Sequence, residues 1–280
     1  MTVPALSNAL KNILVRSGID NPHGDAIEII KTVTGFSRAE MATRAGEELD
    51  DTITEKAIQL ARRRASGEPI QYVIGSWSFM GRDYLVGEGV LIPRDDTEVV
   101  TRAALGLIAP LPRPAVVDLC AGSGIIGITI KKERSDAAVT AVEKSDAAFA
   151  YLERNCRKND APIRLIRADL GDCANEFADG SLDLIVSNPP YICSDEIASL
   201  QSEVQYEPRM ALDGGKDGYD FYEEIVRLWS TKLKKGGRFA FEIGEGQFAS
   251  IARLLEDHGF SEIKGYLDIM NTTRAVSAKK

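Results

Sequence analysis

The residues most able to do chemistry are Asn188, Pro189, Pro190 and Tyr191, which follow a short apolar stretch. Neither proline offers an N–H, so the backbone cannot continue a β-ladder there and is held stiff. The Asn188 side-chain oxygen and the Pro189 carbonyl then form two acceptors for the hydrogens of one planar –NH₂ group. Tyr191 adds an aromatic face for the π system of that group. The pattern indicates a site for a planar amide or amine nitrogen.

The chemistry of such a nitrogen explains the need for two acceptors. An amide nitrogen is a poor nucleophile because its lone pair is delocalised into the carbonyl. Acceptors on its hydrogens orient the nitrogen and stabilise the positive charge that grows while it attacks a methyl carbon. No strong base is required, and none is obvious in the sequence. The hypothesis is therefore methyl transfer to nitrogen, with a plain Pro-Pro turn as the alternative for these four residues alone.

A second segment has the glycine pattern of a nucleotide-binding turn, Gly122-x-Gly124-x-x-Gly127. Glycines let the backbone pass close to a ligand, and the following helix N-terminus points N–H groups at it. Glu143 follows at the end of the next predicted strand, where a carboxylate can accept hydrogen bonds from ribose hydroxyls. The same spacing satisfies the dinucleotide fingerprint, so this loop leaves nicotinamide and methyl-donor interpretations open. Asp118, inside the strand end, favours a cationic methyl donor, and no His or Lys is placed for hydride transfer.

These segments lie at the ends of short, apolar, often β-branched stretches that alternate with helical ones, the rhythm of a parallel sheet covered on both faces. We expect strands at 115–119, 138–143, 163–168, 182–187 and 238–243 and helices near 125–133, 146–158, 219–234 and 246–258. A last pair, 263–267 and 274–278, is too close in sequence for a helical crossover and should be antiparallel.

The first part of the chain reads as a small helical bundle. Ser37 to Glu40 and Thr52 to Glu55 match the capping box, and Pro22 suits a first helical turn. The residues that follow favour β-strands on both sides of Gly81-Arg82, a pattern that predicts a hairpin. We predict a helical domain at 1–70, a β-hairpin linker at 71–92 and a catalytic α/β domain at 93–280.

Composition limits the classes of function. The net charge is −8, and residues 1–88 hold 10 Lys/Arg and 12 Asp/Glu, which leaves −6 for the remainder. A protein whose main partner is a nucleic-acid backbone normally has the opposite sign. The four cysteines lack CxxC spacing, only two histidines are present, and no window is long and apolar enough to cross a bilayer. We expect no metal, no membrane partner, no signal peptide and a cytoplasmic location.

Further motifs give the chain a resemblance to one family, the peptide chain release factor N5-glutamine methyltransferases (the HemK family). The motifs are Gly67-Glu-Pro-Ile-Gln-Tyr72, Gly75-x-x-x-Phe79-x-Gly81, Leu91-Ile-Pro-Arg94-x-x-Thr97-Glu98, Glu207-Pro208-x-x-Ala211-Leu212-x-Gly214-Gly215-x-Asp217-Gly218 and Glu242-x-Gly244-x-x-Gln247. The Asn-Pro-Pro-Tyr segment alone is shared with methyltransferases that act on adenine and cytosine. The resemblance covers about Gly67 to Arg274.

The resemblance implies a seven-stranded class I methyltransferase domain with an N-terminal helical domain that helps grip the substrate. It implies S-adenosyl-L-methionine as donor, S-adenosyl-L-homocysteine as product, and the glutamine of the Gly-Gly-Gln loop of class I release factors as substrate. Asn188 and the Pro189 carbonyl would hold the glutamine amide beside Pro190, and Tyr191 would pack against it. The donor would be bound by Asp118, Cys120, Ala121, Gly122, Ser123, Gly124, Glu143 and Asn188, with Asp169 and Leu170 at its adenine. The family usually has glycine where this chain has Cys120.

Three other functions stay open at this point. An adenine-specific DNA methyltransferase would use the same four-residue site but needs a basic cleft and a base-flipping pocket. A nicotinamide-dependent oxidoreductase would use the glycine loop alone. A non-catalytic binding module on the same fold would not need Asn188 or Tyr191.

Overall fold

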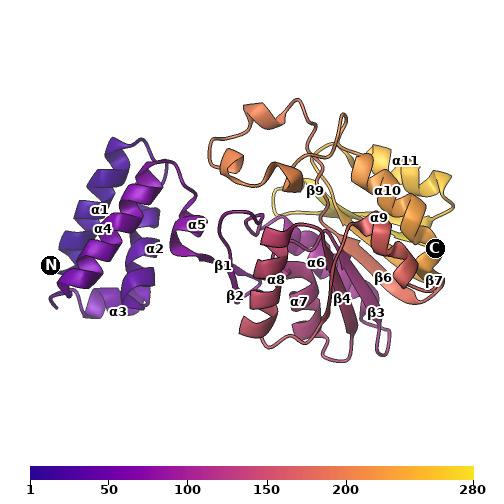
Figure 1. The fold of residues 1–280 in the computed structure, drawn as a ribbon, viewed down its shortest axis with the longest axis horizontal. Coiled ribbons are helices and arrows are strands. Elements are labelled where there is room, and N and C mark those ends of the chain that lie inside the picture. The colour runs from indigo at the N-terminus through magenta and orange to yellow at the C-terminus, as the bar shows by residue number, and fades with distance from the viewer. The chain divides into compact units, whose positions relative to one another are not determined.

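The computed structural model describes all residues, 1–280, as two compact units. The first unit comprises Met1–Ser76 together with the distant segment Gln201–Tyr206, and the second comprises Trp77–Leu200 and Glu207–Lys280. None of the helices combines the length and apolar character that a membrane span requires. Figure 1 shows a helical N-terminal part and an α/β part built around one sheet.

The first unit is a bundle whose three longer helices, α1, α2 and α4, pack on one another. Apolar side chains three and four residues apart give each helix one buried face, as Leu6, Leu10 and Leu14 do in α1. Ile29 and Ile30 of α2 and Ala57 and Ala61 of α4 complete the core. The helices are α1 (Val3–Arg16), α2 (Pro22–Thr34), α3 (Arg38–Thr43), α4 (Asp51–Ala65) and α5 (Ile70–Ile74).

Polar side chains fix where these helices begin. Asn21 caps α2 by accepting a hydrogen bond from the Gly24 N–H, and Ser37 with Glu40 forms the expected capping box of α3. The capping box predicted at Thr52 is wrong. Helix α4 begins earlier because the Asp50 carboxylate accepts the Thr52 N–H at 2.7 Å and so acts as the cap.

The segment Gln201–Tyr206 joins the first unit through an ion cluster centred on Arg64. The Arg64 side chain is almost fully buried and bonds Asp25 at 2.6 Å and also Glu203. A buried guanidinium needs both partners, since an unpaired charge there would be strongly destabilising. The Tyr206 hydroxyl adds a bond to the Ser66 carbonyl at 2.9 Å. No local sequence pattern predicts that residues 201–206 pack with the first unit.

The second unit begins with a hairpin, β1 (Ser76–Phe79) and β2 (Arg82–Leu85), and contains one seven-stranded sheet in the order β5-β4-β3-β6-β7-β9-β8. Pairings among β5, β4, β3, β6 and β7 are parallel, and β9 pairs antiparallel with both β7 and β8. The predicted fold class and the antiparallel final pair are confirmed. The strands are β3 (Ala115–Leu119), β4 (Ala138–Glu143), β5 (Arg164–Arg167), β6 (Leu182–Ser187), β7 (Leu233–Glu242), β8 (Ser261–Leu267) and β9 (Thr273–Lys279).

Helices cover both faces of this sheet, which explains why almost every residue of its central strands is buried (Figure 1). One core contains Val100, Ile126 and Leu152 of the helices on one face, and the other contains Tyr222, Trp229 and Ile251 of the opposite face. The helices are α6 (Thr97–Ile108), α7 (Ile125–Glu133), α8 (Asp146–Lys158), α9 (Leu170–Cys173), α10 (Asp220–Trp229) and α11 (Phe248–Asp257). Short 3₁₀ turns are η1 (Ala174–Glu176), η2 (Ile197–Ser199), η3 (Val204–Tyr206), η4 (Arg209–Ala211) and η5 (Ser230–Lys232).

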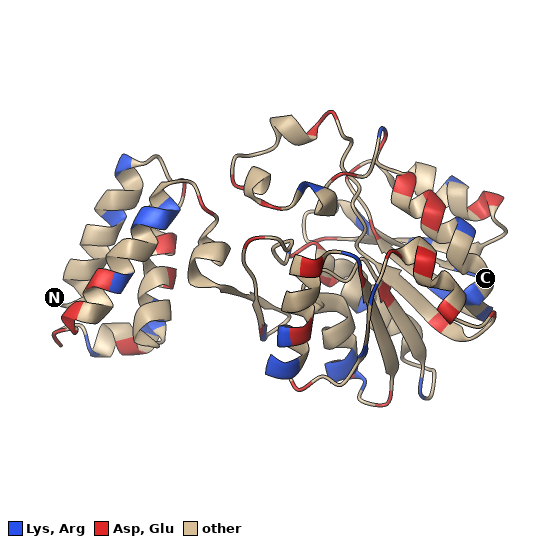
Figure 2. Ribbon diagram, viewed as in Figure 1, with Lys and Arg blue, Asp and Glu red and all other residues tan.

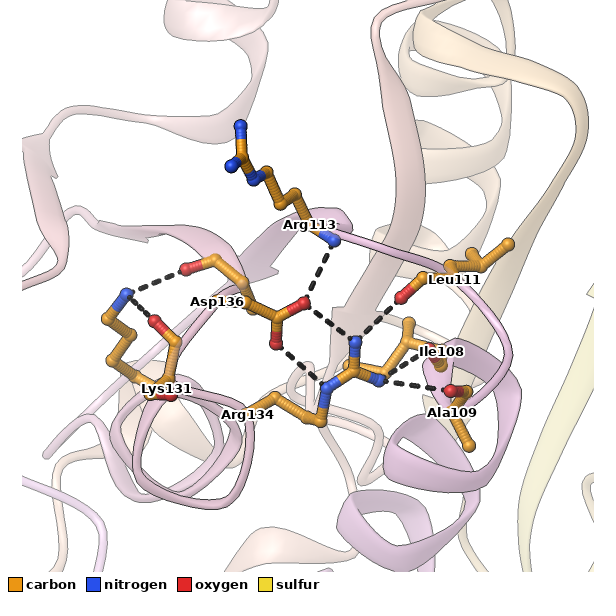
Figure 3. A network of polar contacts seen from close by, with 9 residues as sticks. Ile108, Ala109, Leu111, Arg113, Lys131, Arg134 and Asp136 are labelled. Atoms are coloured by element: carbon orange, nitrogen blue, oxygen red, sulfur yellow. Dashed lines mark hydrogen bonds and ion pairs between the residues drawn. The ribbon is translucent and has the colours of Figure 1, made fainter.

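The end of α6 is tied to the turn after α7 by Arg134 (Figure 3). Its guanidinium donates to the carbonyls of Ile108 and Leu111, each at 2.6 Å, and pairs with Asp136 at 3.0 Å. Cationic donors suit the unpaired carbonyls at a helix C-terminus. Arg134 lies at the end of the sheet where the parallel strands begin, so the network orders the scaffold rather than the edge where the strands end.

Candidate active site

A cavity of about 470 Å³ opens where the parallel strands β3, β4, β5 and β6 end. Open α/β sheets bind ligands at this edge, and the volume lies within the range of small-molecule sites. Its walls come entirely from the second unit. The lining residues are Gly89, Val90, Leu91, Ile92, Thr97, Cys120, Ala121, Gly122, Ser123, Ile125, Ile126, Val142, Glu143, Lys144, Ser145, Ala148, Ala168, Asp169, Leu170, Asn188, Pro190, Pro208, Met210, Ala211, Asp213, Phe221 and Glu224.

The glycine loop between β3 and α7 forms one wall, and its backbone needs glycine at two positions. Gly122 has φ +56° and Gly124 has φ +85°, a region that side chains disfavour. A Cβ on Gly124 would also lie 2.4 Å from Leu152 Cδ1, whereas one on Gly122 would meet no protein atom within 4 Å. Gly124 therefore serves the packing of the loop, and Gly122 leaves space on the cavity side.

Cys120, two residues before Gly122, lies at a third position of this loop where glycine would be favoured. Its φ is +57°, again in the left-handed region, so the cysteine side chain is held at a conformational cost. The residue is half-buried, and burial raises the pKa of its thiol far above the ordinary value. The thiol therefore stays protonated at neutral pH, and a protonated thiol is a weak nucleophile.

The carboxylates of two residues hold the glycine loop in place by accepting hydrogen bonds from its backbone. Glu143, the last residue of β4, accepts the Gly122 N–H at 2.8 Å and the Ser145 N–H at 2.7 Å. Asp118 is fully buried and accepts the Gly127 N–H at 2.8 Å. Burial raises the pKa of Asp118 to about 7 against the opposing effect of this bond, and its second oxygen, Oδ1, has no partner.

The opposite side of the cavity carries Asp169 and Leu170. Asp169 caps α9 by accepting the Gly171 N–H at 2.8 Å and pairs with Lys144 at 2.8 Å. The Lys144 ammonium is the main reason that the pKa of Asp169 lies below its ordinary value. Asp169 is consequently a carboxylate at neutral pH and an acceptor at the cavity wall.

The corner Asn188–Tyr191 follows β6 directly and is held in place from several sides. Gln247 donates from Nε2 to the Tyr191 carbonyl at 3.1 Å and accepts the Gly244 N–H at 2.8 Å. Ile192 exchanges backbone hydrogen bonds with the segment that contains Leu212 and Gly214, at 3.0 and 2.8 Å. Two motifs far apart in sequence therefore fix the position of one rigid corner.

The loop that returns from this corner is anchored by Glu207. Its buried carboxylate accepts the Ile92 N–H at 2.9 Å and pairs with Arg94. Burial raises the pKa of Glu207, while Arg94 acts in the opposite direction. Glu207 therefore fastens a segment that carries four cavity residues, namely Pro208, Met210, Ala211 and Asp213.

The predicted site residues divide between the cavity and its support. Cys120, Ala121, Gly122, Ser123, Glu143, Asp169, Leu170, Asn188 and Pro190 line the cavity, whereas Asp118, Gly124, Pro189 and Tyr191 do not. Tyr191 points its hydroxyl at Glu242, 3.3 Å from Oε1.

The sequence interpretation missed several residues that the fold brings to this site. The cavity also includes Phe221 and Glu224 of α10, and Asn188 contacts Thr97 at the start of α6. The motifs containing Thr97, Glu242 and Gln247 had signalled these positions without assigning them a task. Phe221 and Glu224 carried no such signal.

Comparisons with known proteins agree with this architecture. Residues 5–75 match the family described as PrmC N-terminal domain, and residues 98–205 match the family described as Methyltransferase small domain. A release factor glutamine methyltransferase of Geobacter sulfurreducens is 36% identical over 262 residues, which are 93% of this chain and 90% of that protein. The enzyme of the same name from Clostridium botulinum is 34% identical and covers 96% and 95% of the two chains.

The chain belongs to the release factor glutamine methyltransferase family. The solved catalytic domain of hMettl16 has the same fold, with a TM-score of 0.57 at 14% identity over 82% of this chain and 80% of that one. This family is one of methyltransferases, so the oxidoreductase interpretation of the glycine loop is not favoured. The resemblance stated from the sequence motifs is confirmed.

Proposed function

We propose that this protein transfers a methyl group from S-adenosyl-L-methionine to the side-chain amide nitrogen of the glutamine in the Gly-Gly-Gln motif of class I release factors. The observation that carries the proposal is the position of Asn188. It lines the same cavity as the glycine loop and Glu143, at the end of the next strand of the sheet. Membership of the release factor glutamine methyltransferase family supports the choice of substrate.

The cavity residues fit the donor. Glu143 lies at the end of β4, where its carboxylate can accept hydrogen bonds from ribose hydroxyls, and Asp169 and Leu170 would border the adenine. Cys120 to Gly124 would surround the amino-acid part of the donor. The carboxylates of Glu143 and Asp169 line the cavity and place negative charge there, which suits a cationic ligand, and buried Asp118 keeps an unpartnered Oδ1 next to the loop. When bound, the donor supplies an electrophilic methyl carbon on a sulfonium.

Asn188 and Pro189 would prepare the accepting nitrogen. The Asn188 Oδ1 and the Pro189 carbonyl each accept one amide hydrogen, which directs the nitrogen lone pair and draws electron density onto the nitrogen. As the new N–C bond would form, the S–CH3 bond of the donor would break and release neutral S-adenosyl-L-homocysteine, and the same two oxygens would stabilise the positive charge on the nitrogen. The N–H proton, acidic at that stage, would pass to solvent water, so no strong base is needed. Tyr191 stiffens the corner through the contact of its hydroxyl with Glu242, and its ring would pack against the substrate.

The proposed partner and location follow from the substrate. A class I release factor acts in translation, so we place the activity in the cytoplasm, with the helical first unit contributing to the grip on the release factor. We expect no direct nucleic-acid substrate, because the chain beyond residue 88 carries a net charge of −6. Figure 2 shows Lys and Arg interspersed with Asp and Glu on the helices of the α/β part rather than collected in one stripe.

The experiment is a transfer assay with purified components. Enzyme and donor are incubated with a class I release factor, with the same factor carrying asparagine in place of the Gly-Gly-Gln glutamine, and with adenine-containing duplex DNA. Peptide mass spectrometry should find one added methyl on that glutamine and none in the other two samples. Methylated DNA, or an unmodified release factor, would contradict the proposal.

A further inference from the structure

The amide of the Asn188 side chain can take two orientations, and the backbone does not determine which of them it adopts. Its amide has an acceptor oxygen and a donor nitrogen of similar size, and either one can face the cavity. Only the oxygen can accept a hydrogen from a substrate amide. The proposed reaction therefore needs a contact that selects one of the two orientations of the Asn188 amide.

Thr97 provides that contact from the first residue of α6. Its hydroxyl oxygen lies 3.3 Å from Asn188 Nδ2, and the residue is 1% exposed. A hydroxyl has a single hydrogen, so the Thr97 hydroxyl accepts from Asn188 only while its own hydrogen is directed elsewhere. The acceptor of the Thr97 hydroxyl hydrogen therefore decides whether the Thr97 hydroxyl faces the nitrogen or the oxygen of the Asn188 amide.

Glu242, the last residue of β7, is the acceptor for that hydrogen. The Tyr191 hydroxyl lies 3.3 Å from Glu242 Oε1, and the nearby Thr97 hydroxyl lowers the pKa of the Glu242 carboxyl group, as a hydroxyl whose hydrogen faces a carboxylate does. Glu242 is 1% exposed, and its Oε2 has no partner, so each donor that it retains matters. Above its pKa of about 7 the Glu242 carboxyl group is ionised, and a carboxylate accepts hydrogen bonds and cannot donate one.

We propose that Thr97 and Glu242 are positioning residues that hold the Asn188 side-chain oxygen toward the substrate amide. The Glu242 carboxylate takes the Thr97 hydrogen, the Thr97 oxygen takes the Asn188 Nδ2 hydrogen, and Asn188 Oδ1 is left for the cavity. Reversing Asn188 would set two oxygens against each other or turn the Thr97 hydrogen away from Glu242. The second choice would remove a donor from a buried carboxylate, which is costly. This inference rests on the proposed function, because it assigns a task to Asn188 in that reaction.

The chain offers a matched control one turn along the same helix. Thr101 is fully buried, and its hydroxyl donates to the Thr97 carbonyl at 2.8 Å, so Thr101→Val deletes a buried hydroxyl of α6 without touching Asn188. Thr97→Val makes the same chemical change at the proposed position. Thr97→Ser removes only the methyl group and keeps the hydroxyl.

The test is made above pH 7, where Glu242 is a carboxylate, and measures kcat, the KM for the donor and the melting temperature of the three variants with a release factor as substrate. We expect Thr97→Val to lower kcat about tenfold with the donor KM within about threefold, since misplaced reacting groups cost rate rather than donor binding. Thr101→Val should keep kcat within about twofold at a similar melting temperature, and Thr97→Ser should recover most of the rate lost in Thr97→Val.

Three results separate the possibilities. Equal kcat values for Thr97→Val and Thr101→Val would overturn the positioning role, as would a Thr97→Ser variant as slow as Thr97→Val. A wild-type enzyme that leaves the release factor unmethylated would refute the proposed function instead.

Discussion

The two positive-φ glycines of the loop allow a paired experiment, because alanine at each position is expected to fail for a different reason. In both variants a Cβ enters the left-handed region, which costs about 1–2 kcal/mol, partly offset by the smaller entropy of the unfolded chain. At Gly124 the Cβ would also lie 2.4 Å from Leu152 Cδ1 and 2.9 Å from Ile128 Cδ1. Overpacking of this kind adds about 1–3 kcal/mol.

The expected stabilities follow from these contributions. Gly122→Ala should lose about 1 kcal/mol of unfolding free energy and Gly124→Ala about 2–4 kcal/mol. A domain of this size loses roughly 2–4 °C in melting temperature per kcal/mol, so the two variants should differ by several degrees. Differential scanning calorimetry without donor measures this difference.

Donor affinity should show the opposite order. Gly122 lines the cavity, and its added methyl group meets only space that the donor would fill, so the Kd for S-adenosyl-L-methionine should rise at least about tenfold. Isothermal titration of both variants at a temperature where each is folded gives the comparison. Equal melting temperatures would refute the packing argument at Gly124. Wild-type donor affinity in Gly122→Ala would refute the position of the donor against this loop.

Further predictions concern the acceptor, the buried acid and the scaffold. Asn188→Ala should reduce methyl transfer by about 10²–10³-fold or more while the donor Kd stays within about tenfold, as single-turnover assays and titration would show; full activity would exclude the proposed role. Burial raises the pKa of Glu242 to about 7, so the folded state binds its proton more tightly than the unfolded state. The contribution of this group to the free energy of unfolding is on the order of a few kcal/mol. It is fully present below about pH 4.5 and is lost as the pH rises through about 7. Glu242→Gln should therefore flatten the loss of melting temperature between pH 5 and pH 8, and an unchanged pH profile would contradict this. Arg134→Met should lower the melting temperature by a few degrees and leave kcat unchanged, because its carbonyl contacts lie away from the cavity.

Much of the catalytic unit follows from local sequence. The strands that end before Cys120, at Glu143 and before Asn188 are short apolar segments with helices between them, so the parallel sheet and the edge where their ends meet could be predicted. The last strand pair was also predicted, because six residues between strands leave no room for a crossover helix. The start of α4 could not be predicted to the residue, since Asp50 and Thr52 both offer a capping side chain.

The supporting contacts could not be predicted, because they join residues far apart in the chain. Glu203 pairs with Arg64 across 139 positions, and Asn188 meets Thr97 across 91. No local pattern encodes such a pairing. The sequence marked Thr97 and Glu242 through the family motifs alone, and their proximity to Asn188 required the fold.

The conformation of Cys120 is a related case. The departure from the usual glycine was visible in the sequence, and the structure supplies its consequence, a φ of +57° with a side chain attached. Glycine at this position would remove that strain but also the packing of a half-buried thiol. Two contributions of opposite sign to the stability therefore meet at Cys120.

The central claim is that one rigid corner holds a glutamine amide by two oxygens beside the methyl donor. The most direct measurement is a crystal structure of the enzyme with S-adenosyl-L-homocysteine and a peptide that contains Gly-Gly-Gln. We expect the glutamine amide nitrogen to lie about 3 Å from both Asn188 Oδ1 and the Pro189 carbonyl oxygen, facing the donor sulfur. A glutamine bound elsewhere, or an Asn188 that presents its nitrogen to the substrate, would contradict the account.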